Sequence, residues 1–196
     1  MSGQIPVKAS TDGIAASARA AQKGKGLPPV HLWNPPFSGE IDMRIARDGT
    51  WFHEGSPINR EALVRLFSTI LRKDKDGYVL VTPVEKVRIE VEDVPFVAVD
   101  FDAEGDGDAQ VLSFVTNVGD EAVAGPEHAI RVERDADSGE PAPYVMVRAG
   151  LEARIDRKSF YRLVALGEHQ DVNDQSWFGV MSSGVFFPMI PSEELD

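Results

Sequence analysis

Two short stretches of the chain repeat one pattern of apolar and polar positions. Residues 58–67 align without gaps on residues 155–164, with identical residues at four positions. In each stretch a residue that favours a helix N-cap, Asn59 or Asp156, precedes apolar residues at i, i+3 and i+4. The pattern predicts two amphipathic helices that occupy equivalent places in two similar halves.

The two predicted helices have recognisable ends. In the first, the apolar series continues through Ile70 and Leu71, and two basic residues follow that suit the negative end of a helix dipole, so we expect residues 59–73. In the second, the series runs from Asp156 to Leu166, and Gly167 is a typical C-terminal stop.

Alternating and continuous apolar runs predict strands around each helix. Residues 41–47 and 50–53 flank Asp48-Gly49, a two-residue turn that favours a hairpin. Residues 86–91 alternate apolar and charged side chains, as a half-buried strand does. Further strands are expected at residues 78–82, 94–101, 111–118, 129–133, 144–148, 151–154, 177–181 and 185–189.

These elements define an α+β fold of two β-rich halves with a repeated β-β-α-β motif. The acidic, glycine-rich residues 100–108 are interpreted as the connection between the halves. The expected division is residues 1–30 as an N-terminal tail or short helix, 31–104 as an N-terminal α+β half, and 109–196 as a β-rich C-terminal half.

Composition narrows the function classes. The net charge is −12, which disfavours binding to nucleic acid or to anionic membranes, since both need a basic surface. The chain has no cysteine, which excludes disulfides, cysteine nucleophiles and cysteine-ligated zinc. No apolar run approaches the ~18 residues of a membrane span. We therefore expect a cytoplasmic protein without contact to nucleic acid or membrane.

No catalytic or metal-binding motif is evident. His53 stands beside Glu54, but neighbours on a strand point to opposite faces, and the spacing is not H-E-x-x-H. In a calcium-loop register that starts at Asp100, the twelfth position is Val111, where a glutamate is required. We expect no metal and no cofactor.

Polar groups for binding gather at the corner of residues 82–86, between two apolar strands. Arg60 stands at the start of the first helix, where a cation opposes the helix dipole and calls for an anionic partner. We expect a cleft between the halves to hold the ligand, and the residues assigned to its rim are Trp33, His53, Arg60, Thr82, Glu85 and Lys86.

Several blocks of sequence occur in an order that resembles a known family. These blocks are residues 33–35, 39–43, 48–51, 53–55, 66–67, 78–86 and 91–96. The chain resembles a bacterial family of uncharacterised proteins, domain-of-unknown-function family 1285. The resemblance implies a duplicated β-rich core, a C-terminal half like a pleckstrin-homology barrel, and a signalling or regulatory role. It implies no reaction and therefore no catalytic residue.

The function expected from the sequence is a non-catalytic binding or regulatory module for bacterial signal transduction. It would bind an unknown protein partner or a small ligand, and the oligomeric state stays open. The alternative is a hydrolase that uses His53 with a carboxylate such as Glu54, Asp42 or Glu85.

Overall fold

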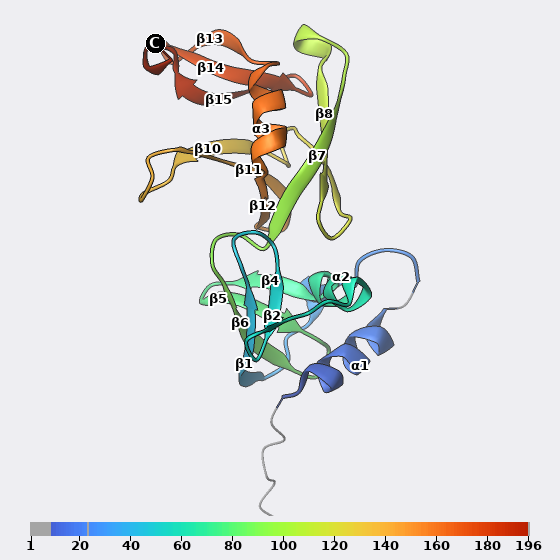
Figure 1. Cartoon of the computed structure of the whole chain (residues 1–196). Helices are drawn as coiled ribbons and strands as arrows, with labels where there is room; N and C mark the ends of the chain where they lie inside the picture. The colour runs from blue at the N-terminus through green and yellow to red at the C-terminus, as the bar shows by residue number, and fades with distance from the viewer. Residues whose placement is uncertain (1–8, 23, 196) are drawn as a thin grey trace, which may run out of the picture. The chain divides into compact units, whose positions relative to one another are not determined.

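The computed structural model describes residues 9–22 and 24–195 of the chain. The chain forms two compact units, Met1–Asp93 and Val94–Asp196, each built on a six-stranded sheet within the described residues (Figure 1). A third, three-stranded sheet belongs to the second unit.

The sheet of the N-terminal unit has the strand order β3-β2-β1-β6-β5-β4. The chain leaves the centre through the β1–β2 hairpin to β3, crosses through helix α2 (Glu61–Thr69) to β4 at the other edge, and returns to β6. There β6 pairs with β1 in parallel. The strands are β1 (Phe37–Ile45), β2 (Trp51–His53), β3 (Ser56–Pro57), β4 (Leu71–Asp74), β5 (Gly77–Val81) and β6 (Lys86–Val91).

The large sheet of the C-terminal unit repeats this strand order as β10-β11-β12-β7-β8-β9, and its first and sixth strands, β7 and β12, again pair in parallel. Helix α3 (Arg157–Val164) then leads to the small antiparallel sheet. The strands are β7 (Phe96–Glu104), β8 (Val111–Thr116), β9 (Glu121–Val123), β10 (Ile130–Arg134), β11 (Pro141–Arg148), β12 (Leu151–Ile155), β13 (Glu168–Val172), β14 (Gln175–Ser182) and β15 (Val185–Pro191).

The expected α+β fold with two similar β-rich halves is confirmed. Each half contains a hairpin followed by a helix and a strand, with the short β3 added in the first. The helices nevertheless enter at different points of the shared strand order. Helix α2 joins the third strand to the fourth, whereas α3 follows the sixth. The similarity of residues 58–67 to 155–164 therefore reflects a common helix pattern placed at two positions in the topology.

The predicted ends of the two helices fare differently. Asp156 is the N-cap of α3, and its Oδ1 accepts a hydrogen bond of 2.8 Å from the backbone N–H of Ser159. The prediction for the first helix is wrong at both ends. Arg60 rather than Asn59 takes the N-cap position of α2, and the helix stops at Thr69. Leu71 begins β4, where it pairs with Leu80. The apolar pattern did not reveal this end, because a buried strand can bury the same apolar residues as another helical turn.

The acidic segment is not a connection between the halves. Its first residues lie in β7, which pairs with β8, and Asp102 stands opposite Ser113. Phe101 points into the core at 3% exposure while Asp100 and Asp102 face solvent, so the acidic sequence begins within a strand, whose register shifts between Ala98 and Asp100. The chain divides earlier, at Asp93 and Val94, and residues 94–101 belong to the second unit.

Of the two expectations for the N-terminus, a short helix is the one observed. Helix α1 (Thr11–Ala21) begins at Ser10, whose Oγ accepts from the N–H of Gly13 at 3.1 Å. Ile14, Ala15 and Ala18 are buried where α1 packs against α2. Small alanines make this face narrow but allow close packing. Residues 1–8, which the prediction also covered, lie outside the described residues.

Two short links fix the small sheet to the large one. The Ser182 hydroxyl, fully buried at the end of β14, accepts from the N–H of Leu112 at 2.9 Å and donates to the carbonyl of Ala124 at 2.8 Å. Gln110 donates to the carbonyl of Met181 at 2.7 Å. These bonds hold β14 and β15 in place beside the large sheet and thereby position the pocket described below.

Candidate functional site

The residues that the sequence assigns to a binding site all lie in the N-terminal unit. Among them, Thr82 stabilises the turn in which it lies. Its side chain is fully buried, and its Oγ1 accepts from the backbone N–H groups of Val84 at 3.4 Å and Glu85 at 3.2 Å. The backbone N–H of Thr82 also donates to the carbonyl of Glu85 at 2.9 Å. The Thr82 hydroxyl thus closes the corner between β5 and β6.

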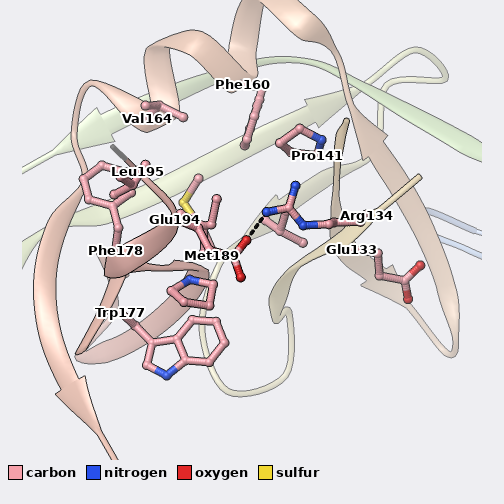
Figure 2. A pocket seen from close by; sticks show the side chains of 13 residues that line it. Glu133, Arg134, Pro141, Phe160, Val164, Trp177, Phe178, Met189, Glu194 and Leu195 are labelled. Carbon is pink, nitrogen blue, oxygen red and sulfur yellow. Dashed lines mark hydrogen bonds and ion pairs between the residues drawn. The ribbon is translucent and has the colours of Figure 1, made fainter. Parts of the chain in front are cut away.

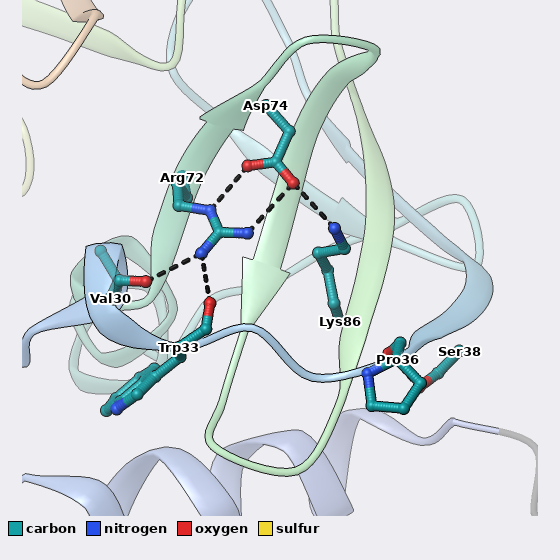
Figure 3. Close-up of polar contacts among 7 residues, drawn as sticks. All are labelled: Val30, Trp33, Pro36, Ser38, Arg72, Asp74 and Lys86. Atoms are coloured by element: carbon teal, nitrogen blue, oxygen red, sulfur yellow. Dashed lines mark hydrogen bonds and ion pairs between the residues drawn. The ribbon is translucent and has the colours of Figure 1, made fainter.

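A polar network ties Lys86 to the segment that carries Trp33 (Figure 3). Lys86 Nζ donates to Asp74 Oδ2 at 3.0 Å. Arg72 donates two hydrogen bonds to the same carboxylate, from Nε at 2.6 Å and from Nη2 at 3.1 Å. Its Nη1 donates to the carbonyl of Val30 at 2.8 Å and to that of Trp33 at 2.7 Å. Asp74 therefore holds Arg72 in position, and Arg72 fixes the extended path through Trp33.

This network makes the stability of the N-terminal unit sensitive to acid. The hydrogen bond from Arg72 holds the pKa of Asp74 below its ordinary value of 3.8. A depressed pKa contributes stability that is complete above the unfolded-state value and is lost as the pH falls through the folded-state value. We expect urea unfolding to show that the wild type loses stability below about pH 4. The Asp74→Asn variant, which is already less stable than the wild type at neutral pH, should lose less. Equal losses in both proteins would contradict this role.

The indole of Trp33 is half-buried and lines a hollow together with Pro83 and Val84. The structure thus brings Trp33 and the corner of residues 82–86 to one region. His53 and Arg60 line a separate hollow of about 270 Å³. In the part of the chain that the structure describes, no hydrogen bond joins the His53 ring to a carboxylate. The ligand-binding role of these residues stays a prediction.

A mostly apolar pocket lies within the C-terminal unit alone (Figure 2). It has a volume of about 300 Å³. Three aromatic rings, from Phe160, Trp177 and Phe178, form much of its wall. The remaining lining residues are Val132, Glu133, Arg134, Pro141, Val164, Met189, Ile190, Pro191, Glu194 and Leu195.

Local geometry explains how these side chains face one space. Phe160 and Val164 stand four residues apart on α3 and so share one face of the helix. In β15 a bulge inserts one extra residue, since Gly179 pairs with Pro188 while Phe178 pairs with Ile190. The bulge lets consecutive residues of β15 reach the pocket, which a regular strand does not allow.

Charged side chains at the pocket are held by partners. Glu194 forms an ion pair with Arg134, which Figure 2 shows reaching towards it. Glu133 pairs with Arg131. Arg131 also donates to both carboxylate oxygens of Glu152 at 2.6 and 2.9 Å, which raises its pKa above the ordinary value. The pocket therefore combines an apolar, aromatic interior with paired charges.

Sequence reasoning assigned no binding role to this pocket. Trp177 and Phe178 belong to a strand that the sequence predicts, and both are half-exposed. The available signal was their adjacency in a predicted strand, because two neighbouring aromatics on a strand cannot both face one core. The elements that meet here are scattered from β10 to the C-terminal turn η3 (Ser192–Glu194), so spacing alone does not reveal them.

The two-unit fold defines a class of duplicated β-rich proteins, and comparison identifies the family. Residues 28–94 match the "Domain of unknown function (DUF1285), N-terminal domain", and residues 95–189 match the "Protein of unknown function (DUF1285), C-terminal domain". The chain belongs to the DUF1285 family, and the boundary between the two family domains falls within two residues of the division between the compact units.

Two solved structures are similar to the chain. A DUF1285 family protein from Silicibacter pomeroyi DSS-3 is 64% identical, with a TM-score of 0.85 over 93% of this chain and 97% of that one. A DUF1285 family protein from Shewanella baltica OS155 is 28% identical, with a TM-score of 0.50 over 64% of this chain and 91% of that one. Among curated proteins, none matches the chain.

The described residues contain no group of three or more His, Asp or Glu side chains arranged to hold a metal ion. Their helices are all too short or too polar to span a bilayer.

Proposed function

We propose that the protein is a non-catalytic binding module with a regulatory role, and that its ligand occupies the apolar pocket of the C-terminal unit. The observation that carries the proposal is the pocket itself. Three half-buried aromatic rings and several aliphatic side chains line a pocket of about 300 Å³ within a single unit. Concave, mostly apolar sites with few polar groups are the usual form of a binding site.

The cost of exposed apolar surface supports this interpretation. Filling the pocket removes aromatic and aliphatic surface from water, which favours binding by roughly 25 cal/mol per Å². The charged residues Glu133, Arg134 and Glu194 each form an ion pair at the pocket. We infer the regulatory role from the proposed binding function, since a module that binds without reacting acts through its occupancy.

A neutral fluorescent probe tests the proposal. N-phenyl-1-naphthylamine carries no charge and brightens in apolar surroundings. We expect it to bind the full-length protein and to bind Val132→Phe at least about tenfold more weakly, because the added ring fills the pocket from β10. Fluorescence titration measures both affinities.

The matched control is Val123→Phe on β9, the opposite edge strand of the same sheet. Val123 is 46% exposed and does not line the pocket. We expect Val123→Phe to bind the probe as the wild type does. If Val132→Phe also keeps wild-type affinity while remaining folded, the pocket is not the binding site.

A further inference from the structure

The acidity of the chain is confined to one unit. Residues 94–196 contain 20 Asp and Glu but only seven Lys and Arg. Residues 1–93 contain 12 acidic and 13 basic residues and are almost neutral. The pocket therefore lies in a strongly negative unit, whose field attracts cations and repels anions.

Acidic side chains are also concentrated beside the pocket. Glu133 and Glu194 line it, and Arg134 is the basic residue of its lining. Asp137 lies in the turn that joins β10 to β11, and Glu193 lies in η3 next to Glu194. Both of these carboxylates are exposed. The lining offers a cationic ligand two carboxylates and an anionic ligand one guanidinium, so it favours a cation.

The existing ion pairs are no obstacle to a cation. In the pair between Arg134 and Glu194 the two side chains are 57% and 43% exposed. In the pair between Arg131 and Glu133 they are 38% and 62% exposed. Exposed pairs of this kind contribute at most about 1 kcal/mol, so their carboxylates can turn to a ligand at little cost.

The size of the pocket points to a side chain rather than to a large cofactor. Its volume of about 300 Å³ is at the small end of ligand pockets, which span roughly 300–1,000 Å³. Protein interfaces gain most of their affinity from one or two apolar anchors in such pockets, surrounded by polar contacts. Aromatic walls also attract cations that lie over the ring faces.

We propose that the pocket receives a basic segment of a partner protein, with a large apolar side chain as the anchor and flanking Lys or Arg residues against Glu133 and Glu194. This inference rests on the proposed binding function and specifies its ligand. The anchor supplies the apolar contact, and the flanking cations supply the preference for one kind of partner.

Three blocked synthetic hexapeptides test the inference by calorimetric titration of the full-length protein. KRLFRK has both the anchor and the cations, KRSSRK lacks the anchor, and EDLFDE reverses the charge. We expect KRLFRK to bind and each of the others to bind at least about tenfold more weakly, and the affinity of KRLFRK to fall as salt is raised. Equal or tighter binding of EDLFDE would overturn the inference.

Matched variants separate the pocket from the general field. Glu133→Gln/Glu194→Gln is expected to weaken KRLFRK at least about fivefold. Asp106→Asn/Asp108→Asn, with the same change in net charge on the exposed turn η2 (Gly107–Ala109), is expected to have a smaller effect. Equal effects of both pairs would show attraction by the unit as a whole and would also overturn the inference.

The neutral probe keeps the two proposals distinguishable. Suppose that the wild type binds N-phenyl-1-naphthylamine, that Val132→Phe does not, and that KRLFRK fails to bind. The proposed binding function then stands, and the proposed basic partner is refuted. If Val132→Phe changes neither ligand, both proposals fail.

Discussion

Gly179→Ala is expected to lower the unfolding temperature of the C-terminal unit by roughly 12 °C or more, which corresponds to about 3 kcal/mol of lost stability. A Cβ atom at position 179 would lie 2.2 Å from the backbone carbonyl oxygen of Phe187 and 2.7 Å from the ring of Phe186. The oxygen belongs to the paired strand β15, so it cannot move away without breaking the ladder. Calorimetric unfolding measures the shift.

Gly184→Ala is the control in the same hairpin. Gly184 has a φ of +74°, and a Cβ there meets no atom within 4 Å. The substitution introduces only backbone strain of about 1 kcal/mol. Equal destabilisation by the two variants would show that close packing at the bulge is not the cause. A lost bulge would also displace Phe178 and Met189, so Gly179→Ala is expected to weaken binding of the neutral probe.

Arg72→Met is expected to destabilise the N-terminal unit by about 2–3 kcal/mol. The Arg72 side chain is 17% exposed, and it satisfies Asp74 and two backbone carbonyls at once. Methionine keeps much of the apolar stem but leaves Val30 and Trp33 without this donor. Urea unfolding measures the loss, and a red shift of tryptophan emission is expected as the segment at Trp33 loosens.

Arg65→Met on α2 is the matched control for that change. Arg65 is exposed, and the described part of the chain offers its side chain no ion pair. We expect its stability to stay within about 0.5 kcal/mol of the wild type. A similar loss in both variants would show that the Arg72 network does not anchor the segment.

Local patterns were sufficient to predict features that depend on a few neighbouring residues. A hairpin at Asp48-Gly49 joins β1 to β2 as expected, although its connection covers residues 46–50 instead of two residues, and Asp156 caps its helix as its side chain predicts. The end of α2 was not predictable, because Ile70 and Leu71 are apolar residues that fit a helix face and a buried strand equally. Only the pairing of Leu71 with Leu80 decides between them.

Features that depend on residues far apart along the chain could not be predicted from the sequence. Strand β7 was assigned to the first half because it follows β6, but its parallel partner β12 lies more than 50 residues further along. No local signal records such a pairing. The pocket has the same origin, since Val132, Phe160 and Trp177 come from three elements that meet only in the folded unit.

The methionine methyl groups offer the most direct test of the pocket. The chain has five methionines, of which Met189 lines the pocket and Met43 lies in the core of the N-terminal unit. In NMR spectra of the full-length protein with labelled methionine methyls, Met189→Leu assigns the signal of Met189. On addition of N-phenyl-1-naphthylamine, we expect the Met189 signal to shift with occupancy while the Met43 signal stays unchanged. A shift of Met43 with no change at Met189 would contradict this expectation.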